Sequence, residues 1–513
     1  MVEPLFTLKE TIPLFVVIPI LVAVISNFFY KRSGLVKVLV SIGMIVLVAL
    51  PFLTTLDNGY YVFGAHPEVT YFLGEGVATA FNLGIAYQYT QVQMVILLAF
   101  AVMAALSIGV ALVFREKVSG VYLFLILMAI SCACAIALVD DIFNLFVFFE
   151  ICTVAQAGIV AWLNEDGAFR TALKYMLLGS VAGGMLLLAV AFLLGSTGVL
   201  NISDMYEMFT SATQRDAPMI FMGLALMVFA WTYGAGLPPF HTIKSELYAR
   251  ASGEAGAVLQ AISKVTLIAV GIIIVRLFFW QEVTWQAMMV ISTFAMVIGA
   301  AMAMVQNDYR RLIAYIAVNQ AGLVGIGLSF YRRLPVQYGP TQYGYAWGHE
   351  GMAYGIFHGF NEIIVTSALF ISAAVLLYTF GHTRMPDIRG IAQRNKEFAV
   401  LTLFSMLAVS GVPPLNAFQS EWKLIQFAFN NGFMVVGLLM VVSTVMVFYA
   451  LAKAFVVMFL RPLPVGEEPK PMEVPFAMIL VLMVAVVFEI FFGLFPEIAI
   501  EPIEAGLAAL FGG

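Results

Sequence analysis

The sequence has little charge and no basic run. Of its 513 residues, 11% are charged and 62% are hydrophobic, and the mean hydropathy is +0.99. A soluble protein of this length normally has about twice that share of charged residues. The net charge of −5 is spread thinly along the chain, which argues against a nucleic acid as a partner because such binding needs concentrated positive charge. Nearly every stretch of about 20 residues is apolar, so the composition predicts a polytopic membrane protein rather than several soluble domains.

Cysteine is also scarce, and the patterns of a catalytic centre are missing. Cys132 and Cys134 are two positions apart, and Cys152 lies on the next apolar run. Positions two apart on a helix face different ways, and no histidine lies at ligand spacing, so we expect three buried thiols and no metal site. The chain has no cofactor motif and no nucleophile–base set, and its longest loops, 57–90 and 331–350, are too short for a redox or nucleotide-binding fold. The sequence therefore predicts no cofactor and no catalytic centre of its own.

Apolar runs of crossing length follow one another along the whole chain, with mostly short loops between them. They predict an all-α membrane protein with about fourteen transmembrane helices. The runs lie near 11–29, 35–55, 91–114, 120–139, 142–163, 171–195, 217–240, 255–279, 284–305, 309–330, 351–380, 398–429, 432–460 and 473–500.

The distribution of Lys and Arg predicts how the chain is oriented. Most of these residues fall on one set of loops, and such loops face the cytoplasm. The opposite set carries only Lys9, Arg215, Arg276, Arg332 and Arg333, and its loop 57–90 has no Lys or Arg. We therefore expect a multi-pass protein of a prokaryotic plasma membrane, with both termini outside.

An internal repeat is present. GLPPFHTIKSEL begins at Gly236 and GVPPLNAFQSEW begins at Gly411, and the two segments align without a gap. They belong to the seventh and twelfth predicted spans, which enter the membrane from opposite sides, so the repeat is inverted. Proline removes a backbone donor and opens a helix, and the breaks fall at Pro238 and Pro239 in one copy and at Pro413 and Pro414 in the other. Paired interruptions in inverted halves indicate an ion or substrate path.

The repeat divides the chain into four parts. We expect three N-terminal helices with their outer loop, a first five-helix repeat, an inverted second repeat and a C-terminal helix, with broken helices 7 and 12. Their bounds are 1–114, 115–280, 281–460 and 461–513.

A few charged residues fall inside the predicted spans, where charge is costly and indicates function. Glu150 and Lys264 are each surrounded by apolar chain, while Glu421 and Lys423 follow the second Pro-Pro break. Burial disfavours the charged form of an acid or an amine, so such groups can exchange protons near neutral pH. A structural ion pair is the alternative for each. Glu421 and Lys423 are two apart and cannot share a helical face, so each needs its own partner.

Two histidines also stand near the proposed path. His358 and Glu362 are four apart on one helical face and could form a proton-relay pair, although a buried histidine is often only a hydrogen-bonded core group. His241, after the first Pro-Pro, could cap or close that broken helix. For Asp140 and Asp141, at the start of the fifth span, we expect an N-terminal helix cap.

Several of these residues lie in segments that resemble a known family. It comprises the antiporter-like subunits of respiratory complex I, of Mrp-type sodium/proton antiporters, and of membrane-bound hydrogenases and their relatives. The resemblance extends from about residue 90 to 430, and its last segment is most similar to the hydrogenase and formate-hydrogenlyase branch. The segments are NLFVFFE at Asn144–Glu150, LPPFH at Leu237–His241, the Lys264 helix ending in Arg276, QNDYRRLIAY at Gln306–Tyr315, the His358 helix, and PPLNAFQSEW at Pro413–Trp422.

The resemblance implies a line of ion-carrying residues at mid-membrane. Glu150 matches the helix-5 glutamate of the family, Lys264 its helix-8 lysine, and Glu421 a helix-12 site that is lysine in many members and glutamate in some. Family members pass protons or sodium along such residues, driven by redox chemistry elsewhere or by an opposing ion gradient. Other membrane subunits of a hydrogenase-like, complex I-like or Mrp-like assembly are therefore expected as partners.

Two positions depart from the family pattern. The helix-7 lysine is replaced by a segment with Tyr233 and Gly234, and a helix-11 position that is often lysine is Glu362. Glu150 thus lacks its usual cationic partner. Lys244 is the nearest candidate replacement, but it lies beyond the helix break.

Two functions are consistent with these features. The first is an antiporter-like subunit that translocates H⁺ and/or Na⁺ within a larger respiratory or antiporter complex, such as a redox-driven oxidoreductase. The alternative is a structural antiporter-like subunit with a degenerate channel that no longer translocates ions. A stand-alone carrier is less favoured because the few buried polar groups suit an ion better than an organic substrate.

Overall fold

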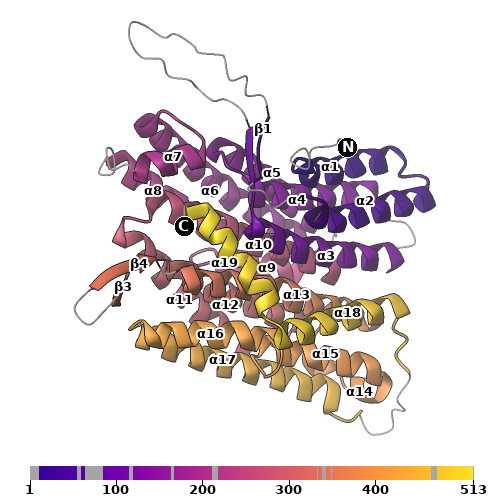
Figure 1. The fold of residues 1–513 in the computed structure, drawn as a ribbon. Coiled ribbons are helices and arrows are strands. Elements are labelled where there is room, and N and C mark those ends of the chain that lie inside the picture. The colour runs from indigo at the N-terminus through magenta and orange to yellow at the C-terminus, as the bar shows by residue number, and fades with distance from the viewer. Residues whose placement is uncertain are drawn as a thin grey trace, which may run out of the picture.

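The computed structural model describes most of the chain, and nearly all of its regular structure is helical (Figure 1). The described residues are 11–54, 59–63, 85–114, 119–162, 167–210, 218–331, 333–337, 343–347, 349–463 and 471–511. Six of the charged loop residues behind the predicted orientation lie outside these ranges, namely Lys9, Arg115, Lys117, Arg215, Arg332 and Lys470. The predicted all-α fold is confirmed.

Twelve helices of the described chain are long and apolar enough to cross a membrane. A helix satisfies its backbone hydrogen bonds internally, which a crossing segment needs in a lipid environment. The twelve are α2 (Ser33–Leu53), α3 (Gln91–Phe114), α4 (Gly120–Leu138), α5 (Ile142–Trp162), α6 (Ala168–Thr197), α8 (Pro218–Ala235), α10 (Gly253–Phe278), α11 (Glu282–Met304), α12 (Tyr309–Ser329), α13 (His349–Phe380), α17 (Met434–Phe455) and α18 (Phe476–Leu494). The chain is a multi-pass membrane protein.

Two further predicted spans correspond to shorter helices. The apolar helix α1 (Leu14–Phe28) has 15 residues, and the predicted span 398–429 consists of α15 (Lys396–Val409) and α16 (Asn416–Asn430), which meet at the second Pro-Pro. If α1 counts as one crossing and α15 with α16 as another, the total is fourteen, and this number remains a prediction. The predicted last span is shorter than expected, because α18 ends at Leu494 and a separate helix, α19 (Glu497–Phe511), follows it.

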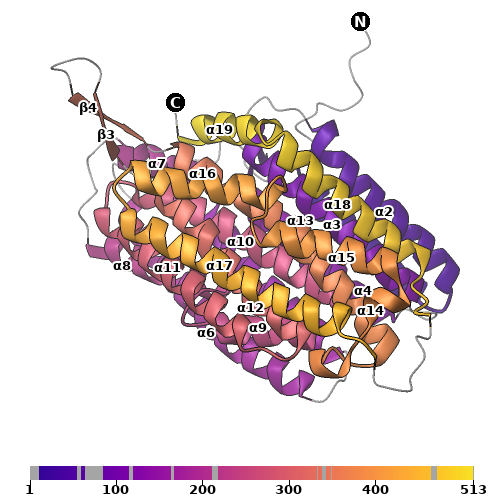
Figure 2. The same ribbon diagram turned by 90° about the horizontal axis from the view of Figure 1, so that it is seen from below.

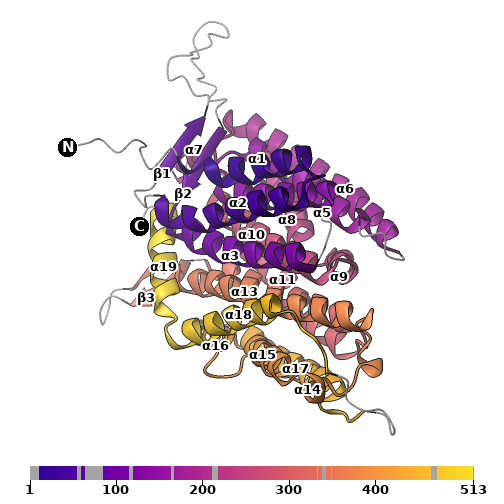
Figure 3. The same ribbon diagram turned by 90° about the vertical axis from the view of Figure 1, so that its right-hand side faces the viewer.

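The remaining elements are short and gather at the helix ends. Helix α7, the paired strands β1 and β2, the paired strands β3 and β4, and α19 lie at one end of the bundle, where α19 crosses the ends of its neighbours (Figures 2 and 3). Helix α14 lies toward the other end (Figure 2). Strand pairs thus occupy parts of the two loops that we expected to be the longest. The bounds are α7 (Ile202–Thr210), β1 (Gly59–Phe63), β2 (Ile85–Tyr89), β3 (Arg333–Gln337), β4 (Tyr343–Trp347), η2 (Met385–Asp387), α14 (Ile391–Arg394) and η3 (Val456–Leu460), which continues α17.

Helix α10 is the centre of the bundle. It packs against α3, α4, α8, α12 and α13, so almost all of its side chains are buried. In Figure 1 the helices of the first half, in indigo to magenta, lie above those of the second half, in orange to yellow, with α10 between them. A charged residue in the middle of α10 is therefore surrounded by other helices of the bundle. The three cysteines, on α4 and α5, are buried and free, as predicted.

The two Pro-Pro segments break their helices in the same way. After α8, the N–H of Gly236 donates to Tyr233 O at 3.2 Å, and the next helix is α9 (His241–Arg250). After α15, the N–H of Gly411 donates to Ala408 O at 3.1 Å before α16 begins. Gly236 and Gly411 both have positive φ, 76° and 65°, a conformation that side chains other than glycine rarely adopt. The sequence repeat is thus matched by a repeat of backbone geometry.

Candidate functional site

Lys244 lies just after the first helix break and is enclosed by protein. On α9 its side chain is 1% exposed. The Nζ atom donates to Ser263 Oγ at 3.0 Å and to Gln156 Oε1 at 3.3 Å, and it lies 5.0 Å from the centroid of the Tyr175 ring. Hydroxyl, amide and aromatic groups, rather than a carboxylate, thus surround this amine. A cation there is stabilised by the ring face and by hydrogen-bond acceptors.

The position expected to hold the family's helix-7 lysine is tightly packed. A Cβ added at Gly234 would lie 2.8 Å from Phe149 Cε2 and 2.9 Å from Thr266 Cγ2, so a side chain at that position would require these neighbours to shift. The neighbouring Tyr233 donates its hydroxyl hydrogen to Tyr175 O at 2.6 Å, and its ring centroid lies 5.9 Å from Lys244 Nζ. Because α9 folds back against α5 and α10, Lys244 reaches this region from beyond the break.

Glu150 is half-buried on α5 and faces α6. Its Oε1 lies against Gly183, where an added Cβ would overlap the carboxylate. The same oxygen is buried and has no hydrogen-bond partner among the described residues. Tyr233 is close to both Glu150 and Lys244, and no salt bridge joins Glu150 to Lys244 in the described part of the chain. An aromatic group therefore separates the acid from the amine.

A small cavity connects Lys244 with Lys264. Both residues line it together with Tyr248, Gln260 and Ser263, and its volume is about 10 Å³, on the order of the space that one water molecule needs. The hydroxyl of Tyr248 donates to Ser263 Oγ at 2.6 Å. The two buried amines, which lie on different helices, thus share one polar contact region.

Lys264 lies on the central helix α10 and is 2% exposed. Its Nζ donates to the backbone carbonyl of Ala317 at 2.8 Å, and Glu362 on α13 is its electrostatic partner. Glu362 is fully buried and accepts a hydrogen bond from Thr366 at 2.7 Å, while its Oε1 has no hydrogen-bond partner in the described chain. The buried amine therefore faces an opposing charge on a neighbouring helix.

His358 connects two other helices instead of pairing with Glu362. Its Nδ1 lies 2.9 Å from Ser420 Oγ on α16, and its Nε2 lies 2.8 Å from Gln320 Oε1 on α12. Glu362, one turn along α13, is bonded to Thr366. The direct His358–Glu362 relay pair that the spacing suggests is therefore not formed. His358 instead links the Lys264 region to the second helix break.

Glu421 is buried on α16, and Lys423 lies apart from it. Glu421 is 4% exposed and accepts a hydrogen bond from Thr444 on α17 at 3.0 Å. Lys423 is partly exposed and forms a salt bridge of 3.0 Å with Glu497 on α19. As the sequence indicated, the two have different partners. Glu421 belongs to the buried set, whereas Lys423 joins α16 to α19 near the surface.

His241 is the first residue of α9 and does not cap it through its side chain. Its Nδ1 is buried and finds no hydrogen-bond partner within the described ranges. In the second repeat the same position holds Asn416, whose Nδ2 donates to Asn361 Oδ1 at 3.1 Å. The two breaks thus differ in the polar group that follows the prolines.

Three polar residues of the interior were not predicted from the sequence. Gln156 and Gln320 bond to Lys244 and His358. Glu489 on α18 is fully buried, and neither of its carboxylate oxygens has a hydrogen-bond partner among the residues that the structure describes. A signal for Glu489 was present, because it is the only charged residue in the apolar helix Phe476–Leu494. The glutamines gave no such signal, since their partners lie on other helices.

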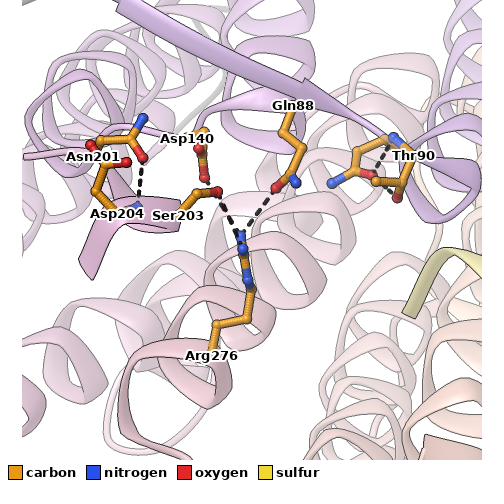
Figure 4. A network of polar contacts seen from close by, with 8 residues as sticks. Gln88, Thr90, Asp140, Asn201, Ser203, Asp204 and Arg276 are labelled. Atoms are coloured by element: carbon orange, nitrogen blue, oxygen red, sulfur yellow. Dashed lines mark hydrogen bonds and ion pairs between the residues drawn. The ribbon is translucent and has the colours of Figure 1, made fainter. Parts of the chain in front are cut away.

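At the end of the bundle that carries α7 and α19, Arg276 gathers a polar network (Figure 4). Its Nη1 lies 3.5 Å from Asp140 Oδ1 and donates to Gln88 Oε1 at 3.0 Å, and its Nη2 donates to Ser203 at 3.3 Å. Burial raises the pKa of Asp140 to about 6, and Arg276 limits that rise. The cap prediction holds for Asp141, which accepts from the N–H of Asn144 at 2.7 Å. It was wrong for Asp140, whose carboxylate turns to the buried arginine.

Fold and interior together define a polytopic membrane protein with charged residues along its core, two of them beside broken helices. Residues 139–447 match the family model described as NADH:quinone oxidoreductase/Mrp antiporter, transmembrane. This is more than half of the chain, and the chain therefore belongs to that family. The resemblance inferred from the motifs is confirmed.

Relatives agree with this assignment. An uncharacterized protein of Methanocaldococcus jannaschii is 35% identical over 492 residues, which are 95% of each chain. An NADH-quinone oxidoreductase subunit of Deinococcus radiodurans is 26% identical over 64% of this chain and 62% of its own. A Na⁺/H⁺ antiporter subunit of Bacillus subtilis is 22% identical over 65% of this chain and 64% of its own.

Solved structures share the fold over its whole length. A chain of the Mrp complex from Dietzia sp. DQ12-45-1b superimposes with a TM-score of 0.84 at 18% identity, covering 99% of this chain and 98% of that chain. A chain of the membrane-bound sulfane sulfur reductase, an archaeal respiratory membrane complex, gives a TM-score of 0.81 at 21% identity, covering 98% and 99%. The described helices thus have the same overall arrangement as these chains of membrane complexes.

Proposed function

We propose that this chain translocates H⁺ and/or Na⁺ as an antiporter-like subunit of a larger respiratory or antiporter complex. The observation that carries the proposal is the set of buried ionisable residues that runs from α9 through α10 and α13 to α16. Its members are Lys244, Lys264, Glu362, His358 and Glu421, which are between 0% and 4% exposed. Buried charge is costly in a membrane protein and is typical of ion pathways.

The contacts support a connected route. Lys244 and Lys264 border one cavity, Glu362 faces Lys264, and His358 bonds to Ser420, the residue before Glu421. The steps from Lys244 to Lys264, from Lys264 to α13 and from α13 to α16 cross between helices, whereas Glu362 and His358 lie one turn apart on α13. Glu150, half-buried on α5, is the entry group that we assign to the other end of this route.

We further propose that the chain works beside other membrane subunits in a prokaryotic plasma membrane. The Mrp complex and the sulfane sulfur reductase complex, in which similar chains reside, support this partnership, and the driving force would come from redox chemistry or an ion gradient in such subunits. The matching breaks at Gly236 and Gly411 support two inverted five-helix repeats, 115–280 and 281–460, flanked by 1–114 and 461–513. The charge asymmetry of the loops supports an orientation with both termini outside.

Gly234 favours a second function. Because this tightly packed position is a glycine rather than the family's lysine, the half of the route near Glu150 lacks that amine, and a degenerate route would make the chain a structural subunit that docks its neighbours. The two functions differ in whether ion flux depends on the buried charges of this chain.

The test is transport by the purified complex. The complex is isolated from native membranes in mild detergent, its co-migrating subunits are identified by mass spectrometry, and it is reconstituted into liposomes. Glu421→Gln is nearly isosteric and should lower coupled H⁺ or Na⁺ flux by roughly ten-fold or more, while subunit composition stays the same. Glu397→Gln, on the exposed start of α15, is the matched control. Equal flux in wild type and Glu421→Gln would favour the structural role.

A further inference from the structure

Glu489 on α18 is a buried acid that the proposed route does not use. It is fully enclosed, and neither carboxylate oxygen has a hydrogen-bond partner in the described part of the chain. An isolated buried carboxylate is strongly unfavourable in either protonation state when it lacks donors and acceptors. Such a group in a native fold calls for a specific explanation.

Two hydroxyl groups on α15 are likewise buried without a hydrogen-bond partner among the described residues. Ser405 lies beside the Glu489 carboxyl, and Thr402 lies one helical turn before Ser405 on the same buried face. Both residues are fully buried, and neither hydroxyl oxygen makes a hydrogen bond to another described residue. The Glu489 carboxylate and the Ser405 hydroxyl thus lie side by side between α15 and α18, with the Thr402 hydroxyl one turn from Ser405, and none of the three forms a well-aligned hydrogen bond to a described residue.

This cluster lies next to the second helix break. Gly493, one turn after Glu489 on α18, has no room for a Cβ because the Pro414 carbonyl lies against it. Gln419 on α16 donates to Gly493 O at 3.0 Å. Helix α18 is therefore fixed against the broken backbone of α15 and α16, and Glu489 is held one turn from that break. Broken helices inside a membrane protein are where ion sites are built.

The charges that surround Glu489 do not neutralise it. Helix α13 contributes Glu362, which is also an acid and faces Lys264. Helix α16 contributes Glu421, bonded to Thr444. The charged residues of α15, Lys396 and Glu397, are exposed at its start, and α3 has no ionisable residue between Gln91 and Phe114. The nearby amine on α10 already has an acid partner, so Glu489 needs a positive charge from elsewhere.

We propose that Glu489, Ser405 and Thr402 form a binding site for a monovalent cation, either Na⁺ or a proton carried with water, at the junction of α13, α15 and α18. All its donors are hard oxygen atoms, which suit a hard cation, and among the described residues no N–H group competes for the carboxylate. A single positive charge neutralises the single carboxylate. The site rests on the proposed function in that it lies one helix away from Glu362 and forms a branch of the same route.

The site is tested without measuring transport. The purified complex in lipid bilayers is examined by infrared difference spectroscopy, first between NaCl and choline chloride at fixed pH and then between low and high pH without Na⁺. The C=O band of a protonated buried carboxyl should disappear when Glu489 exchanges its proton for Na⁺, or when it releases the proton at high pH. Loss of the band on adding Na⁺ at fixed pH identifies a Na⁺ site, whereas loss with pH and no response to Na⁺ identifies a proton site.

Three variants make the result specific. Glu489→Gln should lack this component of the band, and Ser405→Ala should shift the Na⁺ concentration or pH of half-loss by roughly ten-fold. Glu501→Gln, exposed on α19, should give the wild-type spectrum. Identical difference spectra in wild type and Glu489→Gln would overturn the site. A Glu489 band that responds as expected, together with ion flux that is the same in wild type and Glu421→Gln, would instead count against the proposed function alone.

Discussion

The ammonium group of Lys244 donates a hydrogen bond to the Ser263 hydroxyl, 3.0 Å away. This contact joins the short helix after the first break to the central helix α10, and Ser263 directly precedes Lys264 in the chain. Lys244 therefore connects Tyr233 and Glu150 on one side with the Lys264 cavity on the other. A residue outside the family pattern thus holds the position between the two halves of the proposed route.

Replacement of Lys244 by methionine should interrupt that connection. The substitution keeps an apolar stem of similar length and removes the amine that lies beside Tyr175 and Gln156. We expect the complex to assemble and coupled ion flux in liposomes to fall by roughly ten-fold or more, since a positioned proton-transfer group contributes at least that much. The control is Lys174→Met on the exposed face of α6, where the lysine lies 3.9 Å from Glu246. Unchanged flux in Lys244→Met would assign this lysine a structural role.

Two adjacent glycines on α6 test the placement of Glu150. An added Cβ at Gly183 would overlap the Glu150 carboxylate, whereas at Gly184 it would meet nothing within 4 Å in the described structure. Gly183→Ala should therefore displace the carboxylate and reduce flux. Gly184→Ala should leave flux unchanged and, as alanine favours a helix over glycine by about 1 kcal/mol, should not lower stability. The same flux in both variants would contradict a role for the observed Glu150 position.

The helix breaks could be predicted from the sequence because their cause is local. Two consecutive prolines and a glycine decide the backbone at Gly236 and Gly411 whatever surrounds them. The burial of Lys264 and Glu421 was predictable for a similar reason, since each lies in or beside an apolar run. Features that depend only on a residue and its immediate neighbours in the chain could thus be predicted from the sequence.

The side chain that each polar residue contacts could not be predicted from the sequence, because it depends on how the helices pack against one another. The spacing of His358 and Glu362 suggested a pair, yet His358 bonds to residues on other helices and Glu362 bonds to Thr366. Asp140 looked like a cap and instead faces Arg276. Lys244 was the nearest candidate to replace the missing lysine, but its approach to Tyr175 and Ser263 depends on how α9 folds back against α5 and α10. The spacing of residues determines which face of a helix each one occupies, whereas tertiary packing determines which residue of a neighbouring helix contacts it.

The Asp140–Arg276 pair should be important for stability rather than for transport. Both side chains are buried, with exposures of 1% and 6%. Asp140→Asn leaves Arg276 without this counter-charge, and breaking a buried pair in this way costs about 3 kcal/mol or more. We expect a lower thermal unfolding temperature of the purified protein, and partial recovery in Asp140→Asn/Arg276→Gln because no lone charge remains.

An exposed pair provides the comparison for that experiment. Arg384 and Asp387 lie 3.3 Å apart with exposures of 69% and 47%. Arg384→Gln should change stability by less than about 1 kcal/mol, as is usual for surface pairs. If the single variant at Asp140 were as stable as Arg384→Gln, the network in Figure 4 would not stabilise this end of the bundle.

Lys264 and Glu362 should act in transport as one unit. Each is the opposing charge of the other within the described core, so removing either leaves an uncompensated buried charge and breaks the same step. Lys264→Met and Glu362→Gln should each lower flux by a similar factor, and the double variant should lose little more than either single variant. Residues that work as a unit show this strong non-additivity. Flux of the four proteins in liposomes gives the coupling directly, with Glu350→Gln at the exposed start of the same helix as the control. Multiplicative losses in the double variant would mean that the two residues serve independent steps, and the route would then have to pass from Lys264 to His358 without Glu362.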